Sequence, residues 1–274
     1  MRIDKVLLVF RKDWAELRRN WQVVLPIVLL PLMISMSLPM ILNSLSNSIT
    51  MPGSALGTFE IIIRNLPYQT RREVEGMTYP QATIYMISIY LIAPVFLTIP
   101  ILTSSVIASD SFAGEKERRT IEALLATPMS DAELFMGKVL VAFVPSVTIT
   151  AGSSIVYSIA TDLILSGLFN GRLLFPNPIW ILVTFGLAPA IAIASIGLTV
   201  MISLRVKGFR EAQQLSAFLM IPIMLLTFVQ VSGVMILGSV IMLGSIVLFL
   251  MIDAILLYHG VEAFKRDEIL SKLA

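Results

Sequence analysis

The sequence predicts an all-α integral membrane protein with six transmembrane helices, and three observations support this fold class. The chain has 274 residues, of which 57% are hydrophobic and only 14% charged, and its mean hydropathy is +0.88. Soluble domains carry about 45–50% apolar and about 25% charged residues. Several stretches are also long and apolar enough to cross a bilayer, and the Lys and Arg residues gather in alternate connecting segments.

The composition also excludes several other classes of protein. The formal net charge is only +2, from 20 basic and 18 acidic residues, so the chain has no basic footprint for nucleic acid. The chain has no cysteine, which excludes disulfides, zinc–thiolate sites and iron–sulfur clusters. Disordered chains combine low hydrophobicity with high net charge, and this sequence has the opposite composition. The expected environment is therefore the lipid bilayer.

We expect one transmembrane domain over residues 1–274, built from six apolar stretches. A helix needs roughly 20 mostly apolar residues to cross about 30 Å of hydrocarbon. The stretches are residues 22–42, 83–108, 139–163, 179–204, 215–229 and 234–258. The fifth is short, and it either begins earlier, at Ala212, or crosses only in part. The first is longer than the apolar region of about 7–15 residues in a signal peptide, so we expect it to be retained.

The basic residues predict the orientation of these stretches, because cytoplasmic segments are enriched in Lys and Arg. Sixteen of the 20 lie in the N-terminal segment 1–21, in segment 109–138, after the fourth stretch, or in the tail 259–274. The remaining four lie in the outer segment 43–82 or in the loop after the third stretch. We therefore expect a multi-pass protein of the cell membrane with cytoplasmic N- and C-termini and an even number of crossings.

The N-terminal segment is predicted to form an amphipathic helix. Phe10, Trp14, Leu17 and Trp21 recur at helical spacing and share one face, while charged residues occupy the rest. Such a helix lies in the headgroup plane of a bilayer. The alternative is a cytoplasmic extension of the first stretch. On the other side of the membrane, the outer segment 43–82 has room for a short helix or a small lid but not for a catalytic domain.

The cytoplasmic segment 109–138 is predicted to contain a short amphipathic helix. Ile121, Leu124 and Leu125 share one helical face, and charged residues surround them. Pro128 disfavours helical geometry at the residue before it, so the helix ends there.

A second helix is expected to begin directly after this proline. Ser130 and Glu133 match a capping box, in which each side chain bonds a free backbone N–H of the other residue. This helix leads into the third stretch, so the chain makes a compact bend that projects toward the cytoplasm. By periodicity alone the bend is either a docking surface or a solvated connector.

One string in this segment resembles a known family motif. The string GEKERRTIEALLATPMS, residues 114–130, and the Gly137-Lys138 pair after it resemble the motif that follows the second span in the ABC-2 family of ABC-transporter permeases. Ile121 stands where Leu is common in the family, a change that keeps the apolar face. The layout of the whole chain is also similar, with a basic N-terminal helix, six spans and a long first outer segment.

The resemblance implies the permease subunit of an ATP-driven transporter, which exports a substrate with the help of a separate ATP-binding subunit. It also implies pairing with a second copy or a sister permease, and the pattern is closer to the sodium-extrusion and drug-efflux branches than to polysaccharide exporters. In such families the cytoplasmic coupling helix between the second and third spans contacts the ATP-binding subunit. Carried onto this sequence, the coupling residues are Glu115, Glu117, Thr120, Glu122, Leu124, Leu125 and Pro128.

The chain is not expected to be an enzyme. A P-loop needs Gly-x-x-x-x-Gly-Lys-Ser/Thr, but the Gly137-Lys138 pair is followed by Val139 and lacks the upstream glycine. We therefore expect no cofactor in this chain, with ATP and magnesium bound on the partner subunit. His259 is the single histidine, so a metal site is not expected either.

Asp253 is the one charged residue predicted inside a span, near the cytoplasmic end of the sixth. A charge at mid-bilayer costs at least about 2.5–3.5 kcal/mol, so such residues are functional candidates by default. Two alternatives to ATP-driven export remain. One is a secondary transporter that uses Asp253, which would transport without any ATPase. The other is a membrane anchor or assembly factor that recruits an ATPase, which would show no ATP-dependent flux.

Overall fold

The computed structural model describes residues 2–49, 68–118, 120, 129–206, 208–231 and 239–263, and every regular element in those residues is a helix. In chain order the elements are α1 (Ile3–Arg19), α2 (Trp21–Ser48), α4 (Tyr68–Val74), α5 (Tyr79–Met86), η1 (Ile87–Leu91), α6 (Ile92–Phe96), α7 (Thr98–Ser109), η2 (Asp110–Gly114), α8 (Glu115–Glu117), α10 (Asp131–Ile164), α11 (Pro178–Ile181), η3 (Leu182–Leu187), α12 (Ala188–Ser203), α13 (Phe209–Ser216), η4 (Ala217–Met220), α14 (Ile221–Val231) and α15 (Ser239–Ala263). Of these, η1, η2 and η3 are π-helical and η4 is a 3₁₀-helix. The predicted all-α class is confirmed for the described residues.

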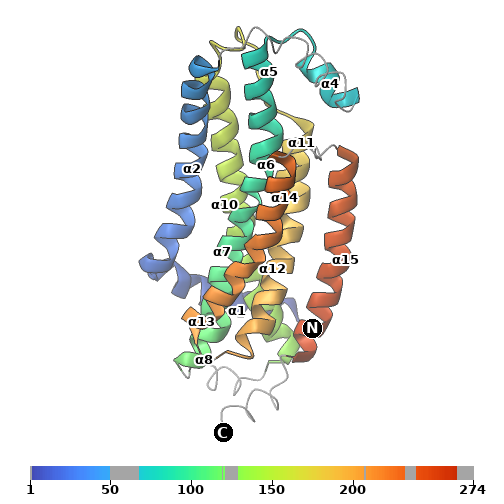
Figure 1. Cartoon of the computed structure of the whole chain (residues 1–274). Coiled ribbons are helices and arrows are strands. Elements are labelled where there is room, and N and C mark those ends of the chain that lie inside the picture. Colours follow the sequence, from blue (N-terminus) through green and yellow to red (C-terminus); the bar gives the residue numbers. More distant parts are fainter. Residues whose placement is uncertain are drawn as a thin grey trace.

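The long helices lie side by side and form a bundle (Figure 1). In the described part of the chain, five helical stretches have the length and composition to cross a membrane: Trp21–Ser48, Tyr79–Glu117, Asp131–Ile164, Pro178–Ser203 and Val240–Glu262. They overlap the predicted first, second, third, fourth and sixth stretches. The chain is therefore a multi-pass membrane protein.

The predicted fifth stretch, residues 215–229, is helical but is not among the five candidate spans. It falls in a helical run from Phe209 to Val231 that consists of α13, η4 and α14. Figure 1 shows α14 ending below the upper ends of α2 and α10. This run is not among the five stretches above, so the six-span count stays a prediction.

The second long helix continues past its predicted end at residue 108. Instead of changing to a connector, the chain stays helical through η2 and α8, as far as Glu117. A π-helical turn adds one residue to the helix without breaking it. The predicted coupling segment, residues 109–138, therefore begins on a direct extension of a membrane helix.

Aromatic side chains fill the upper half of the bundle. Tyr157 stacks on Trp180 with ring centroids 4.7 Å apart, and Phe96 lies 5.0 Å from Tyr157. The Trp180 indole N–H donates to the Ile89 carbonyl and the Tyr157 hydroxyl donates to the Ser88 carbonyl, both at 3.1 Å. Both acceptors belong to the π-helical turn η1, where the carbonyls leave the ordinary α-helical register. The aromatic cluster therefore supplies donors where the helix is irregular.

The N-terminal helix α1 lies across the lower end of the bundle and packs against α10 (Figure 1). The backbone leaves helical geometry at Asn20, with φ −88° and ψ 78°, so α1 is not a straight extension of α2. The residues of α1 buried against the bundle are Val6, Val9, Asp13 and Leu17. Trp21, which was expected to share the aromatic face, is 69% exposed. The position of α1 in the headgroup plane stays a prediction.

The predicted capping box at the start of α10 is confirmed. The Glu133 N–H donates to Ser130 Oγ at 3.3 Å, and the Ser130 N–H donates to Glu133 Oε2 at 3.0 Å. The other oxygen of Glu133 accepts from the Arg2 N–H at 2.7 Å. One carboxylate therefore begins α10 and also holds the first turn of α1 against it.

Candidate functional site

Charged side chains from three separate segments meet at the lower end of the bundle. α1 contributes Lys12 and Asp13, α8 contributes Glu115, and α10 contributes Lys138. We call these four residues the ion-pair network. Asp13, Glu115 and Lys138 are only 5%, 2% and 0% exposed, so most of the network is out of water. Its two cations balance its two anions.

Lys138 is the centre of the ion-pair network. Its Nζ lies 2.6 Å from Glu115 Oε2 and 3.3 Å from Asp13 Oδ2, and it donates to the Ser111 carbonyl at 2.8 Å. A lysine ammonium has three N–H donors, so these acceptors can use all of them. Ser111 Oγ is a further neighbour at 3.2 Å. A buried ammonium is tolerated only when it is paired in this way.

Lys12 supplies the second cation from the solvent side. Its Nζ lies 3.0 Å from Glu115 Oε1, 3.1 Å from Asp13 Oδ1 and 3.4 Å from a carboxylate oxygen of Glu16. Burial alone would lower the pKa of Lys12, but the carboxylates of Asp13 and Glu115 outweigh it and hold that pKa above its ordinary value. Lys12 therefore stays charged at physiological pH.

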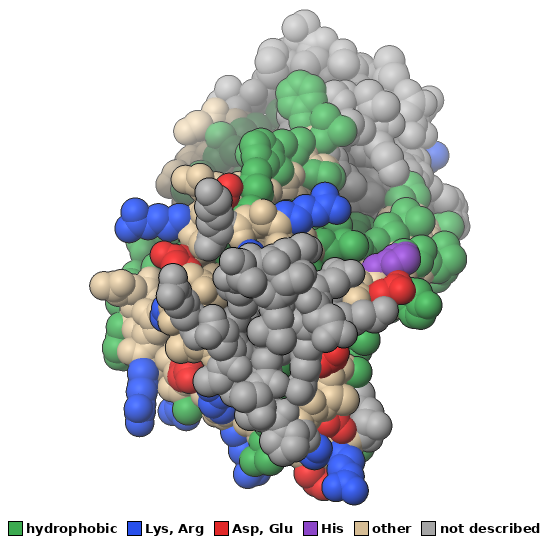
Figure 2. Space-filling model, turned by 90° about the horizontal axis from the view of Figure 1, so that it is seen from below, with side chains coloured by type: hydrophobic (Ala, Val, Ile, Leu, Met, Phe, Trp, Pro, Cys, Tyr) green, Lys and Arg blue, Asp and Glu red, His purple; other side chains and the backbone are tan. Residues whose placement is uncertain are grey.

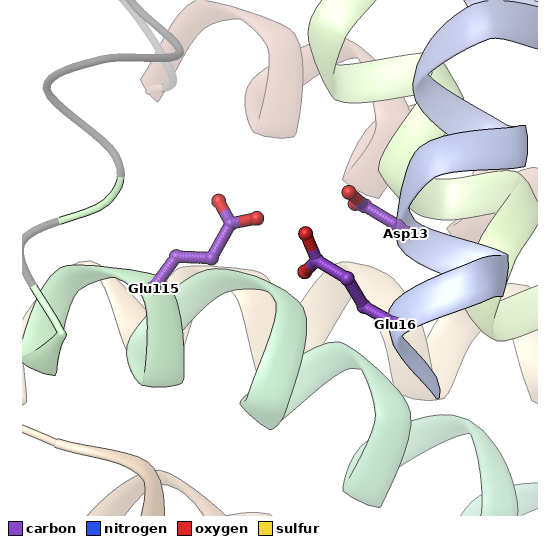
Figure 3. Close-up of side chains that lie close together, drawn as sticks. All are labelled: Asp13, Glu16 and Glu115. Atoms are coloured by element: carbon purple, nitrogen blue, oxygen red, sulfur yellow. The ribbon is translucent and has the colours of Figure 1, made fainter. Parts of the chain in front are cut away.

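Asp13, Glu16 and Glu115 point toward one another (Figure 3), and one carboxylate oxygen from each lies within 4.8 Å of the other two. Three carboxylates at this spacing could hold a metal ion. However, both oxygens of Asp13 and both oxygens of Glu115 already face Lys12 or Lys138. A metal ion would have to displace two ammonium groups, so the donor set fits a structural ion-pair network better than a metal centre.

Gly137 explains how α1 comes close enough to reach Lys138. A Cβ at this position would lie 2.6 Å from Val9 Cβ and 3.1 Å from the Val6 carbonyl oxygen. Only glycine leaves room for α1 to cross α10 at this point. One helical turn further along α1, Asp13 then reaches the ammonium of Lys138, the next residue on α10, and Lys12 reaches Glu115. In the Gly137-Lys138 pair of the sequence motif, Gly137 therefore allows the close helix packing and Lys138 supplies the buried positive charge.

Two further predicted coupling residues are held within the chain near the ion-pair network. Glu117 accepts from the Phe209 N–H at 2.9 Å, at the first turn of α13. The backbone N–H of Thr120 donates to the Glu115 carbonyl at 3.0 Å. Glu117 and Thr120 are exposed, whereas the Glu115 side chain is buried. The predicted coupling residues Glu122, Leu124, Leu125 and Pro128 lie outside the described residues.

Sequence reasoning missed Lys12, Asp13 and Ser111. A signal for Asp13 was present, because Val6, Val9, Asp13 and Leu17 recur at helical spacing and place one acid within an apolar stripe. An acid in such a stripe calls for a buried cation as its partner. Nothing in the sequence pattern identifies Lys138 as that partner, since 125 residues separate the two.

A cavity of about 710 Å³ lies beside the ion-pair network, between α2, α7 and α13. Apolar residues line most of it, and Asp110, Glu117 and Arg118 lie at its lower end. Arg118 and Asp110 form an ion pair at 3.0 Å there. The elements that carry the start of the coupling segment therefore also form the walls of the cavity.

Asp253, the predicted intramembrane ionisable residue, lies inside the bundle on α15. It is 3% exposed, and neither carboxylate oxygen has a hydrogen-bond partner among the described residues. His259 lies further along the same helix, 3.8 Å from Glu262. The structure therefore separates Asp253 from the ion-pair network, where all the acidic groups have partners.

Comparison with known proteins gives the family of this chain. Among curated proteins, none matches the chain significantly. A family model described as ABC-2 family transporter protein matches residues 7–243, which include most of α1, the predicted coupling segment and most of the bundle. The match also covers all four residues of the ion-pair network. This match, over well more than half of the sequence, shows that the chain belongs to the ABC-2 family of transporter membrane proteins.

Proposed function

We propose that this chain is the permease subunit of an ATP-driven exporter, and that a separate ATP-binding subunit binds residues 120–128 and thereby moves the membrane helices. Family membership supports a membrane component of an ABC transporter. The observation that carries the proposal is the ion-pair network, which ties the beginning of the coupling segment to α1 and α10. If a partner subunit displaces this segment, the displacement reaches the membrane helices only through firm contacts such as these ion pairs.

The charge distribution supports a cytoplasmic position for this end of the molecule. Figure 2 looks at the lower end and shows Lys and Arg side chains around it. Basic residues are enriched in cytoplasmic segments. In this orientation α1 and the end of α15 lie on the cytoplasmic side, and an ATP-binding subunit in the cytoplasm can reach residues 120–128.

The contacts suggest a route for the movement. Glu115 would carry it to α1 through Lys12 and to α10 through Lys138. Glu117 would carry it to the first turn of α13. Because α7 and α13 both line the large cavity, displacement of these helices would change its shape. For ATP to drive this change, the ATP-binding subunit must bind the two permease conformations with different affinities.

The rest of the assembly follows from the same proposal. ATP and magnesium belong to the ATP-binding subunit, and the complete transporter contains a second copy of this chain or a sister permease. The sodium-extrusion or drug-efflux branch stays a prediction from the sequence pattern. In this scheme Glu115 and Glu117 act inside the permease through their contacts with other helices, while the exposed Thr120 and residues 121–128 would contact the partner.

Replacing Leu124 with Asp should weaken association with the ATP-binding subunit at least about thirtyfold, because a residue central to an interface contributes about 2 kcal/mol or more. The measurement is affinity purification of the tagged full-length chain from its native membranes, with any ABC ATPase identified by mass spectrometry. The matched control is Leu173→Asp, which changes a leucine that is 68% exposed at the opposite end of the bundle.

The control should retain the ATPase and ATP-dependent flux in vesicles. Equal recovery of the ATPase with Leu124→Asp and with the unchanged chain would contradict the proposed contact. Flux by the chain without any ATPase would instead favour a secondary transporter. A stable complex that hydrolyses ATP but moves none of a panel of ions, drugs and lipids would favour the anchor or assembly role.

A further inference from the structure

Asp253 is the buried carboxylate that the proposed mechanism does not use. It is the only Asp, Glu, Lys or Arg between Ser239 and Tyr258, a stretch of otherwise uncharged residues in α15. The side chain is 3% exposed, and both oxygens lack a hydrogen-bond partner among the described residues. By contrast, the buried acids of the ion-pair network face ammonium groups on every oxygen.

The packing of α15 on α12 and η3 defines the surroundings of Asp253. A Cβ on Gly197 would lie 2.8 Å from Leu256 Cβ, and one on Gly186 would lie 2.6 Å from the Ile246 side chain. These two contacts, one on η3 and one on α12, show that α15 runs parallel to this continuous helix. Asp253 precedes Leu256 by about one turn on α15, so it lies in the part of that helix that packs on α12.

Among the described residues, the elements packed against α15 provide no counter-charge for Asp253. α11, α12 and η3 contain no charged residue. On α10, Lys138 donates to Glu115, Asp13 and Ser111. Glu133 accepts from the backbone N–H groups of Ser130 and Arg2, and Asp131 is at the first turn of the helix. Asp162 accepts from the Leu174 N–H near the upper end. On α15 itself, His259 and Glu262 pair with each other. Among the described residues, no ion pair includes Asp253.

An ionised carboxylate without a partner is strongly disfavoured away from water. A bound cation neutralises the carboxylate, and a proton does so without any further ligand. A metal ion requires several oxygen ligands at once, but Asp253 belongs to no group of acidic or histidine side chains close enough to hold one, in the described part of the chain. We propose that Asp253 is a proton-binding site, which carries a proton as a neutral carboxylic acid in this conformation.

This site adds a function that the ATP-binding subunit does not supply. Both oxygens of Asp253 are closed off from solvent here, so the proton exchanges with water only when α15 separates from α12. A conformational change of the permease would thus be coupled to uptake or release of a proton. The proposal concerns this chain alone and does not depend on the ATPase contact.

Dicyclohexylcarbodiimide tests the proposal, because it reacts with carboxylic acids that are protonated in an apolar environment. The acid proton moves to one carbodiimide nitrogen and the carboxylate oxygen bonds the central carbon; the adduct rearranges to a stable N-acylurea, with no leaving group. The full-length chain in lipid nanodiscs is treated with the reagent over a range of pH and analysed by mass spectrometry. We expect label on Asp253, falling roughly tenfold per pH unit once the acid ionises, and no label at that position in Asp253→Asn.

The matched control is Asp162→Asn, which removes a half-buried acid at the upper end of α10 and should leave the Asp253 label unchanged. Protection of Asp253 by sodium chloride at constant pH would overturn the proposal in favour of a metal cation. Infrared absorption gives a second measurement that needs no reagent access. The unchanged chain should show a neutral carboxylic acid C=O band that Asp253→Asn lacks, and identical spectra would overturn the proposal.

Discussion

Replacing Lys138 with Met lowers the free energy of unfolding of this chain by about 3–5 kcal/mol, the usual effect of removing one partner from a buried ion pair. The Lys138 ammonium is fully buried and lies 2.6 Å from Glu115 and 3.3 Å from Asp13. Without it, one oxygen of each carboxylate is left buried without a cation. The measurement is SDS titration of the purified chain, followed by far-UV circular dichroism.

The matched control for Lys138→Met is Arg11→Met, which removes an exposed positive charge from α1. Surface changes of this kind usually alter stability by no more than about 0.5 kcal/mol. An equal loss of stability in the two variants would show that Lys138 contributes only to net charge, and would contradict the ion-pair network as a tie between helices.

A double variant separates loss of the pair from loss of packing. Adding Glu115→Gln to Lys138→Met removes one anion together with one cation, so Lys12 and Asp13 remain as a balanced pair. Replacing a buried ion pair by uncharged groups is often close to neutral in stability. We therefore expect the double variant to be more stable than Lys138→Met alone, and a further loss of stability would contradict this explanation.

Gly137→Ala is expected to destabilise the chain by about 1–3 kcal/mol, the range found when a methyl group is forced into a well-packed core. The added Cβ would lie 2.6 Å from Val9 Cβ and 3.1 Å from the Val6 carbonyl oxygen. Because the second contact is with backbone, a change of side-chain rotamer cannot relieve it, and α1 must move away from α10. That movement would also pull Asp13 away from Lys138 and Lys12 away from Glu115.

Gly152→Ala is the matched control, since it makes the same change on the same helix where a Cβ would meet nothing within 4 Å. Alanine is better than glycine in a helix by roughly 0.5–1 kcal/mol, so this variant should be neutral or slightly more stable. If Gly137→Ala were as stable as Gly152→Ala in SDS titration, α1 would not be held against α10 as described.

Much of the fold could be predicted because its signals are local. Helical stretches at five of the predicted positions have the length and composition of spans, and the Ser130–Glu133 capping box lies where the sequence places it. The end of the second helix was harder to predict. The sequence predicts that the second span ends at residue 108, but the helix continues to Glu117, where Glu115 and Glu117 have partners on other helices.

The candidate site depended on contacts that no local pattern contains. Glu115 and the Gly137-Lys138 pair were found through a family motif, but their physical roles come from α1, which reaches them from more than 100 residues away. Asp13 was overlooked because a surface charge is the usual outcome for an acid in a basic helix. Packing of two helices decides which charges are buried, and a single sequence does not state which helices pack together.

The central claim is that the coupling segment at the α1 end faces the cytoplasm, where an ATP-binding subunit can grip it. Since the chain has no cysteine, a single exposed cysteine reports its side of the membrane directly. Thr120→Cys and Arg172→Cys place one at each end of the bundle, and both positions are exposed. With a membrane-impermeant maleimide, we predict that Cys at 172 reacts in intact cells while Cys at 120 reacts only in inverted membrane vesicles. Reaction at position 120 in intact cells would place the coupling segment outside the cell and contradict the account.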